Sequence, residues 1–280
     1  MYNYSMKRIF LIFLISVIIQ PVQAFSFYSQ ENAVKNVIKS QIKYANKGNF
    51  DKFIATYDSS YVNSDGFNLD VYSELIKDVW STYNNIKYDV KIKNVEVNNN
   101  TAQVEVVEYA NAGLAVTKNY TGALNSVSNN IYNLEKIDGK WKVVSDSIID
   151  ETTTMLYGAA QNLDIKLTVP QEIAPDTEYT ASLEFDAPND TIAIASISSD
   201  KIEYPQKQSK EVFRTMPEDN ILERLFTSNS DNADEYVVAA IGLTKTNVED
   251  LSIKLSLTGF GYVIKRVNVL SSKDEVSVNE

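Results

Sequence analysis

Carboxylates and tyrosines are the side chains through which this sequence could do chemistry. The chain has 37 Asp and Glu residues and 17 Tyr residues, but it contains no His and no Cys. Without imidazole or thiol groups, a Ser-His-Asp triad, a Cys-His dyad and the usual zinc sites are excluded. What remains is chemistry by paired acids, by a buried Asp or Glu beside a Tyr, or by oxygen-ligated calcium.

Motifs that bind metals or phosphates are missing from the chain. The nearest acidic segments, 231–235 (DNADE) and 63–66 (NSDG), lack the ligand spacing of a calcium loop and are typical of turns. The nine glycines are scattered and form no phosphate-binding pattern. We therefore expect neither a cofactor nor a metal.

Glu108 is the sharpest candidate for acid–base chemistry. Period-two alternation places it on the same strand face as Val104 and Val106, which predicts an inward side chain. A carboxylate on an apolar face would have a raised pKa and could act as a base. The alternative, which we favour, is that the strand ends near Glu108 and that water solvates the carboxylate.

Asp146 is a second candidate on a later strand. Alternation places it on one face with Val144 and Ile148, opposite Trp141 and Val143, so one of the two sets must point outward. Burying a Trp removes the larger apolar area from water. We therefore expect Trp141 to point inward and Asp146 to lie on the surface.

Three aromatic side chains are candidates for contact with a ligand. Tyr57 and Tyr61 are four residues apart and are expected on one helical face. Trp80 could form the bottom wall of a cavity. Core or rim packing is the ordinary role of such residues and is the expected one here. The candidate ligand-binding residues are therefore Tyr57, Tyr61, Trp80, Glu108 and Asp146, and none is assigned as catalytic.

Helical and strand patterns follow one another in the first half of the chain. Apolar residues recur at spacings of three and four residues in segments 29–45 and 68–83, which predicts two amphipathic helices. A further short helix is expected within 48–66. After residue 85 the period becomes two, with a phase slip at 93–94 that predicts a bulge. The expected strands are 88–97, 102–110, 131–136 and 140–149, with hairpin turns at 98–100 and 138–139. This order predicts an α+β domain.

Two segments in this order carry a resemblance to a known superfamily. The stretch GNFDKFIATYDSSYVNSDG (48–66) opens with Gly-x-Phe-Asp-x-Phe, and DGKWKVVSDSIID (138–150) contains Gly-x-Trp-x-Val. Over residues 29–151 the chain resembles the nuclear transport factor 2-like superfamily, including its SnoaL-like members with a cystatin-like cone. The resemblance implies three helices on a curved antiparallel sheet, with an apolar cavity at the wide end.

The resemblance also bears on activity. Enzymes of the superfamily use acids, histidines or tyrosines that project into the cavity, and this chain has no histidine. A reaction like that of scytalone dehydratase is therefore not expected. An arrangement like that of ketosteroid isomerase or an epoxide hydrolase would need two inward carboxylates near a Tyr. Glu108 or Asp58 with a neighbouring Tyr is the acid–base pair that the sequence offers.

The second half of the chain has an all-β pattern. Residues 152–162 are small and polar and are interpreted as a linker, and 163–270 contains several short alternating strands separated by turn signals. This pattern favours a β-sandwich that resembles bacterial immunoglobulin-like modules in pattern only. A short helix is expected from Pro217, and 271–280 is interpreted as a flexible tail.

The N-terminus and the charge indicate where the protein acts. Residues 1–24 combine Lys7 and Arg8 with an apolar run and a small-residue end, which predicts a signal peptide, with a retained anchor as the alternative. We expect an exported protein, periplasmic or extracellular, that leaves the membrane after cleavage. The net charge of −11 argues against nucleic-acid binding. The oligomeric state is not indicated.

Three functional hypotheses fit these patterns. The first is a non-enzymatic binding protein whose cone holds a small apolar ligand, or an envelope or extracellular protein, with the sandwich as support. The second is an isomerase, lyase or hydrolase that uses a buried carboxylate and a Tyr. The third is a structural envelope component. Ligand binding predicts a cavity of a few hundred Å³, catalysis predicts converging titratable groups, and a structural role predicts a filled cone with an exposed apolar patch.

Overall fold

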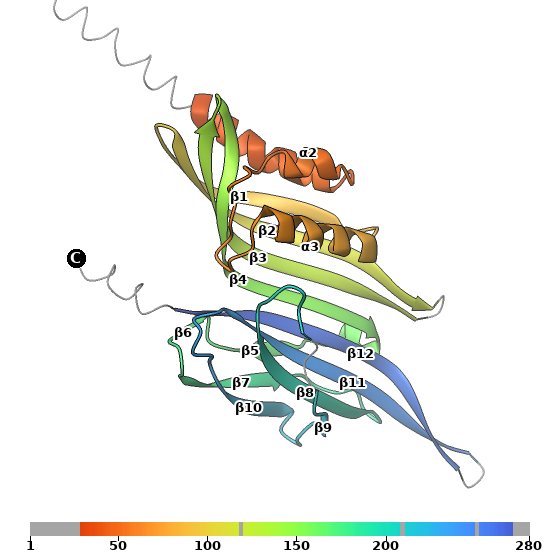
Figure 1. The fold of residues 1–280 in the computed structure, drawn as a ribbon. Coiled ribbons are helices and arrows are strands. Elements are labelled where there is room, and N and C mark those ends of the chain that lie inside the picture. The colour runs from red at the N-terminus through yellow and green to blue at the C-terminus, as the bar shows by residue number, and fades with distance from the viewer. Residues whose placement is uncertain (1–28, 118–119, 208–210, 250–251, 271–280) are drawn as a thin grey trace, which may run out of the picture.

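A computed structural model describes residues 29–117, 120–207, 211–249 and 252–270. Helices gather on one face of the first strands, and the second half is built of strands (Figure 1). The predicted signal peptide at 1–24 and the predicted tail at 271–280 lie outside the described residues. Among the residues that are described, no helix is long and apolar enough to cross a membrane.

Three helices precede the strands, as the apolar spacing predicts. The first occupies residues 29–45 and is followed by a turn in which Gly48 has φ +62°. Helix α2 (Phe50–Ile54) is short, and its N-cap Asn49 accepts a hydrogen bond from the Lys52 backbone. Helix α3 (Leu69–Thr82) begins after Asn68, whose side chain accepts from the Val71 backbone N–H.

Most strands belong to one nine-stranded sheet that runs through both halves of the chain. Its order is β1-β2-β3-β4-β12-β11-β8-β9, and β6 pairs with β12. The first four strands are β1 (Lys87–Asn98), β2 (Thr101–Thr117), β3 (Tyr120–Ile137) and β4 (Lys140–Gly158). The others are β6 (Glu172–Ile173), β8 (Ile192–Lys201), β9 (Arg214–Thr215), β11 (Glu235–Glu249) and β12 (Ser252–Val269).

A second, three-stranded sheet covers part of the first. Its order is β10-β7-β5, with β5 (Lys166–Thr168), β7 (Glu178–Glu184) and β10 (Ile221–Thr227). Buried side chains from β5 and β7, such as Leu167 and Leu183, form one core with buried side chains from β8, β11 and β12. The second half of the described chain therefore has a hydrophobic core of its own.

Two elements of the second half differ from the sequence-based expectation. Residues 152–158, expected in a linker, continue β4 and pair with both β3 and β12, and η1 (Ala159–Asn162) follows. Small Thr side chains are compatible with a strand as well as with a linker, and pairing on both sides selects the strand. The expected helix from Pro217 is a turn followed by β10, because residues 221–227 pair with β7.

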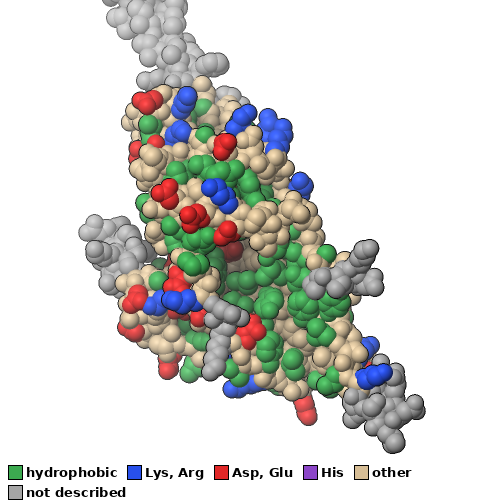
Figure 2. Space-filling view, turned by 45° about the vertical axis from the view of Figure 1, so that its right-hand side comes forward, with side chains coloured by type: hydrophobic (Ala, Val, Ile, Leu, Met, Phe, Trp, Pro, Cys, Tyr) green, Lys and Arg blue, Asp and Glu red, His purple; other side chains and the backbone are tan. Residues whose placement is uncertain are grey.

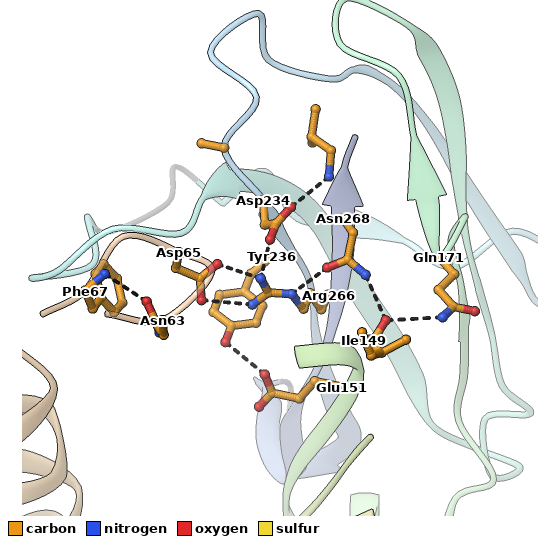
Figure 3. A network of polar contacts seen from close by, with 12 residues as sticks. Asn63, Asp65, Phe67, Ile149, Glu151, Gln171, Asp234, Tyr236, Arg266 and Asn268 are labelled. Carbon is orange, nitrogen blue, oxygen red and sulfur yellow. Dashed lines mark hydrogen bonds and ion pairs between the residues drawn. The ribbon is translucent and has the colours of Figure 1, made fainter. Parts of the chain in front are cut away.

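The two halves are also joined by a buried arginine. Arg266 on β12 is 1% exposed, and its guanidinium contacts both oxygens of Asp65 at 3.2 and 2.5 Å. The same guanidinium contacts Asp234 and donates through Nε to Asn268, and nearby Tyr236 donates to Glu151 (Figure 3). Asp65 lies in the loop before α3, so this network fastens a loop of the first half to the sheet of the second.

Candidate functional site

A small cavity lies between the helices and the sheet of the first half. Its volume is about 70 Å³, and its walls come from the first helix, α2, α3 and strands β1 to β3. The lining residues are Gln41, Ile42, Ala45, Phe53, Tyr57, Tyr72, Ile76, Trp80, Tyr88, Asp89, Glu108 and Tyr132. Wider hollows of about 420 to 610 Å³ elsewhere are open grooves on the surface. The cavity is smaller than the few hundred Å³ that the ligand-binding hypothesis predicts.

Glu108 projects into this cavity. Tyr132 Oη–H donates to its Oε1 at 3.0 Å and Asn130 Nδ2–H donates to its Oε2 at 2.7 Å. Burial and, to a smaller extent, Asp146 raise the pKa of Glu108, and the hydrogen bonds from Tyr132 and Asn130 lower it, so that the pKa lies at about 7. Glu108 therefore points inward as the alternation predicts, and its partly buried carboxyl is hydrogen-bonded by side chains instead of lying at a solvated strand end. The reason is that β2 does not end near Glu108 but continues to Thr117.

Two buried amides near Glu108 have unpaired atoms. Asn130 is 5% exposed and its Oδ1 has no hydrogen-bond partner, and Gln41 is 3% exposed with its Nε2 unpaired. If the Asn130 amide flips, Oδ1 can accept the proton of a neutral Glu108. Gln41 lines the cavity, so its free N–H donors are available to a molecule held there.

Asp146 is buried, which corrects the expectation that it lies on the surface. It is 7% exposed, and its Oδ1 accepts from Tyr61 Oη at 2.6 Å. Trp141 is buried as well, because β3 pairs Leu134 with Val143 and Asn133 with Ser145 and skips Val144. This bulge switches the alternation, so that residues on both sides of it point inward. Burial raises the pKa of Asp146 to about 6.

The three aromatic candidates are all part of this interior. Tyr57 and Tyr61 do not share a helical face, because α2 ends at Ile54; Tyr57 instead bridges to Val143. Both are buried, but of the two only Tyr57 is among the residues that line the cavity. Trp80 lines the cavity and also packs edge-on against Phe53, with ring centroids 5.5 Å apart. Asp58 accepts from Ser60 and is not among the lining residues.

Sequence reasoning missed several residues of the site. Tyr132 shares an alternating face with Leu134 in the strand predicted at 131–136, and Tyr72 lies on α3 one helical turn before Ile76. Both positions were signalled by local periodicity. Tyr88 likewise begins the alternation of the strand predicted at 88–97, whereas Asn130 and Gln41 carried no such signal, because their roles depend on pairing between distant segments.

The cavity therefore combines titratable groups with aromatic walls. Glu108 and Tyr132 converge within hydrogen-bond distance, and Asp146 with Tyr61 forms a second acid–tyrosine pair nearby. No Lys or Arg is among the lining residues. Within the described ranges, no group of His, Cys, Asp or Glu residues is arranged to hold a metal ion.

Hydrophobic side chains are also exposed outside the cavity. Figure 2 shows many of them gathered over the middle of one face of the molecule. Large exposed examples in the second half are Leu255 at 67%, Leu225 at 61% and Leu257 at 54%. An exposed apolar patch is a feature that the structural hypothesis predicts, although the cone of that hypothesis would be filled.

The chain is similar over less than half of its length to several solved NTF2-like structures. An NTF2-like protein with a cystatin-like fold from Novosphingobium aromaticivorans is 14% identical with a TM-score of 0.38, and the match covers 46% of this chain and 88% of that one. The hexachlorocyclohexane dehydrochlorinase LinA-type3 from Novosphingobium barchaimii is 13% identical with a TM-score of 0.37, covering 45% and 88%.

A further similar structure is a longer protein. Bd1075 of Bdellovibrio bacteriovorus is 14% identical with a TM-score of 0.34; the match covers 41% of this chain and 38% of Bd1075. No protein-family model and no curated protein matches the sequence. These matches show a similar fold over less than half of the chain. The dehydrochlorinase activity is that of the Novosphingobium barchaimii protein.

Proposed function

We propose that the first half of this chain is a binding module that holds a small organic molecule in the cavity between the helices and the sheet. The observation that carries the proposal is the position of Glu108 at the cavity wall, held by Tyr132 and Asn130, with the unpaired amide of Gln41 in the same lining. A few convergent polar groups among apolar walls are what a small-molecule site requires.

The volume limits the size of the molecule. About 70 Å³ exceeds the roughly 10–15 Å³ that one water needs and is well below the roughly 300–1,000 Å³ of pockets for drug-sized ligands. The cavity therefore suits a molecule of roughly four non-hydrogen atoms. At a ceiling of about 1.5 kcal/mol per such atom, the dissociation constant would be no tighter than tens of micromolar.

In this proposal the second half supports the binding half or contacts a partner protein. Its own core and its exposed leucines are consistent with a module of that kind. The immunoglobulin-like sandwich, export to the periplasm or the extracellular space, and a partner in the envelope all remain parts of the proposal that follow from the sequence pattern.

A cavity-filling substitution tests the binding function. Ala45 lines the cavity, whereas Ala33 is exposed on the same helix. Ligand-observed NMR with a panel of ethanolamine, propylamine, ethylene glycol and acetate, each of about four non-hydrogen atoms, is expected to detect binding of at least one of these molecules to the purified chain. Ala45→Leu should abolish that binding and Ala33→Leu should preserve it, with circular dichroism confirming that both variants fold. Equal binding by the two folded variants would place the ligand elsewhere.

Acid–base catalysis is a second candidate, favoured by a specific observation. The pKa of Glu108 is about 7, near that of an efficient general acid or base at neutral pH, and Tyr132 donates to the same carboxyl. Such a group could remove a proton from the carbon beside a carbonyl group and return a solvent proton to it.

Deuterium exchange separates this candidate from simple binding. Acetone in D₂O would exchange its methyl protons faster in the presence of the wild-type chain, and Glu108→Gln would remove the acceleration. Glu105→Gln, on an exposed residue of the same strand, should leave it unchanged. Exchange at the buffer rate with wild-type protein would reject catalysis on small ketones and leave binding intact.

A further inference from the structure

We infer that the ligand of this cavity is a small primary ammonium cation that also carries an acceptor oxygen, a molecule of the amino-alcohol type. The inference rests on the proposed binding function of the same cavity and names its ligand class. Three features of the lining support it: the sign of its charge, its aromatic walls and its one unpaired buried donor.

The charged side chains of the lining are all acidic. Glu108 and Asp89 are its two acidic residues, and Lys and Arg are absent from it. Asp146 lies close enough to Glu108 to disfavour a second negative charge there. Lys142 directs its ammonium to the backbone carbonyls of Ala55 and Tyr57. A cation is therefore the charged group that this cavity attracts, and an anion is repelled.

Aromatic rings make up half of the lining. They are Phe53, Tyr57, Tyr72, Trp80, Tyr88 and Tyr132. Their polar atoms are largely used within the protein: Trp80 Nε1–H donates to Tyr88 at 3.1 Å, the Tyr57 and Tyr72 hydroxyls are 3.2 Å apart, and Tyr132 donates to Glu108. What the walls then offer a ligand is aromatic surface, which attracts ammonium groups through the ring quadrupole.

The side-chain amide of Gln41 indicates that the ligand must also carry a hydrogen-bond acceptor. Its Nε2 has no hydrogen-bond partner although the residue is 3% exposed, and leaving a buried donor unpaired is costly. An ammonium group cannot accept a hydrogen bond from this donor, but a hydroxyl oxygen on the same ligand can. A molecule with ammonium at one end and hydroxyl at the other satisfies Glu108 and Gln41 together.

Protonation of Glu108 should control the binding. The groups that act on its carboxyl are Tyr132 and Asn130 from β3, Asp146 from β4, Tyr72 from α3 and Tyr88 from β1. None of them is a cation. Ionised Glu108 can therefore form a salt bridge with an ammonium ion, whereas neutral Glu108 cannot. The affinity for a cation should rise as the pH rises through about 7, the pKa of Glu108.

A panel of probes matched in size tests the ligand class. Ethanolamine, propylamine, ethylene glycol and acetate each have about four non-hydrogen atoms and differ in charge and in acceptor oxygens. We expect ethanolamine to bind most tightly, propylamine more weakly and acetate not at all. Titrations in amine-free phosphate buffer at pH 6 and pH 8, followed by NMR and by Trp fluorescence, to which Trp80 at the cavity wall contributes, should show tighter ethanolamine binding at pH 8.

Variants assign the two ends of the ligand. Glu108→Gln should weaken ethanolamine about tenfold or more and remove its pH dependence, while the binding of ethylene glycol stays within about twofold. Glu105 is exposed on the same strand, so Glu105→Gln is the matched control. It should change neither the affinity for ethanolamine nor its pH dependence. Gln41→Leu should reduce ethanolamine to the affinity of propylamine and leave propylamine itself unchanged.

The outcomes that overturn the inference differ from those that overturn the proposed function. If ethylene glycol or acetate binds as tightly as ethanolamine and Ala45→Leu blocks it, the cavity binds small molecules but the ammonium class is wrong. If ethanolamine binding is unchanged by Glu108→Gln, the inference is also wrong. If no probe binds at tens of millimolar to the folded wild-type chain, both the inference and the proposed function fail.

Discussion

Two carboxyl groups in the interior of the first half dominate the chemistry of this protein at the scale of single residues. Glu108 and Asp146 each accept a hydrogen bond from a tyrosine, and burial raises the pKa values to about 7 and about 6. In each case the carboxyl binds protons more tightly in the native state than in the unfolded chain. The native state is therefore stabilised as the pH falls through these values.

Replacing Glu108 should change how stability depends on pH. Its ordinary pKa is 4.5 and its native pKa is about 7, so its burial costs progressively more as the pH rises across that window. Through this group, the free energy of unfolding of the wild-type chain should fall by on the order of 3 kcal/mol between acid and alkaline pH. Glu108→Gln should remove that part of the slope in urea unfolding at pH 5 to 8.

The fold of this variant and a control can be checked together. Asn130 Oδ1 is unpaired and can accept from the new amide after a flip, so Glu108→Gln should fold. Glu105→Gln should keep the wild-type slope, because Glu105 is exposed. A slope that is identical in all three proteins would show that Glu108 titrates normally.

The hydroxyl of Tyr61 should contribute to stability through Asp146. Tyr61→Phe leaves a buried carboxylate without its donor and should cost roughly 1–3 kcal/mol at pH 8. The loss should be smaller at pH 5, where Asp146 is protonated. Tyr204→Phe is the matched control, since Tyr204 donates to Asp78 at 2.5 Å on the surface, and its loss should stay within about 0.5 kcal/mol. Similar losses in urea unfolding would contradict this account.

At the scale of elements, α3 and β4 position the interior groups. Helix α3 carries Tyr72, Ile76 and Trp80 to the cavity wall, and its first turn is fixed by Asn68. Strand β4 brings both Trp141 and Asp146 inward because the bulge at Val144 reverses its alternation. The site therefore depends on a helix start and on a register shift.

Removing the cap of α3 should weaken the helix that carries the cavity wall. Asn68→Ala removes the acceptor of the Val71 N–H and should cost about 1 kcal/mol in the free energy of unfolding. Asn68→Asp keeps an acceptor and adds a negative charge at the helix N-terminus, so it should be neutral or slightly stabilising. Urea midpoints followed by Trp fluorescence measure both. An Ala variant as stable as wild type would contradict the assigned role of the cap.

At the scale of the whole molecule, the two halves share a sheet and a buried ion network. Strand β4 pairs with β12 over residues 152–158, and Arg266 on β12 contacts Asp65 of the first half and Asp234 of the second. These contacts make the halves one continuous structure, in contrast to the two linked domains expected from the sequence. Unfolding of one half should therefore destabilise the other.

Removing Arg266 should show this coupling. Arg266→Met leaves Asp65 and Asp234 without their cation and should cost about 3–5 kcal/mol. Both Trp residues of the chain, Trp80 and Trp141, lie in the first half, so Trp fluorescence reports that half alone. We expect the urea midpoint measured by Trp fluorescence to fall, although the substitution lies in the second half.

Two further proteins complete that experiment. Adding Asp65→Asn and Asp234→Asn to Arg266→Met should restore part of the stability, because no unpaired charge then remains. Arg224→Met is the control on β10, where the side chain bonds the carbonyl of Ile197 and stacks on Phe226, and its loss should be smaller. A Trp midpoint unchanged by Arg266→Met would mean that the halves unfold independently.

Much of the first half could be predicted because its signals are local. The helices at 29–45 and 69–82, the hairpin at 98–101, the bulge in β1 and the inward face of Glu108 all follow from spacing within one segment. The short helix α2 was predicted too long, since the Tyr57 and Tyr61 spacing suits a helix and an aromatic-lined loop equally. The errors at Asp146 and at 152–158 have another origin, because each depends on how a strand pairs with a distant one.

The sequence by itself determined the chemistry that is open to this protein: without His or Cys, any site must be built from carboxylates, tyrosines and amides. It also determined the local elements, since helical and strand periodicity are properties of short segments. Only the tertiary structure decided which groups meet. Glu108, Tyr132 and Gln41 come from three separate segments, and the pKa of Glu108 depends on the water that their packing excludes, which no short-range pattern encodes.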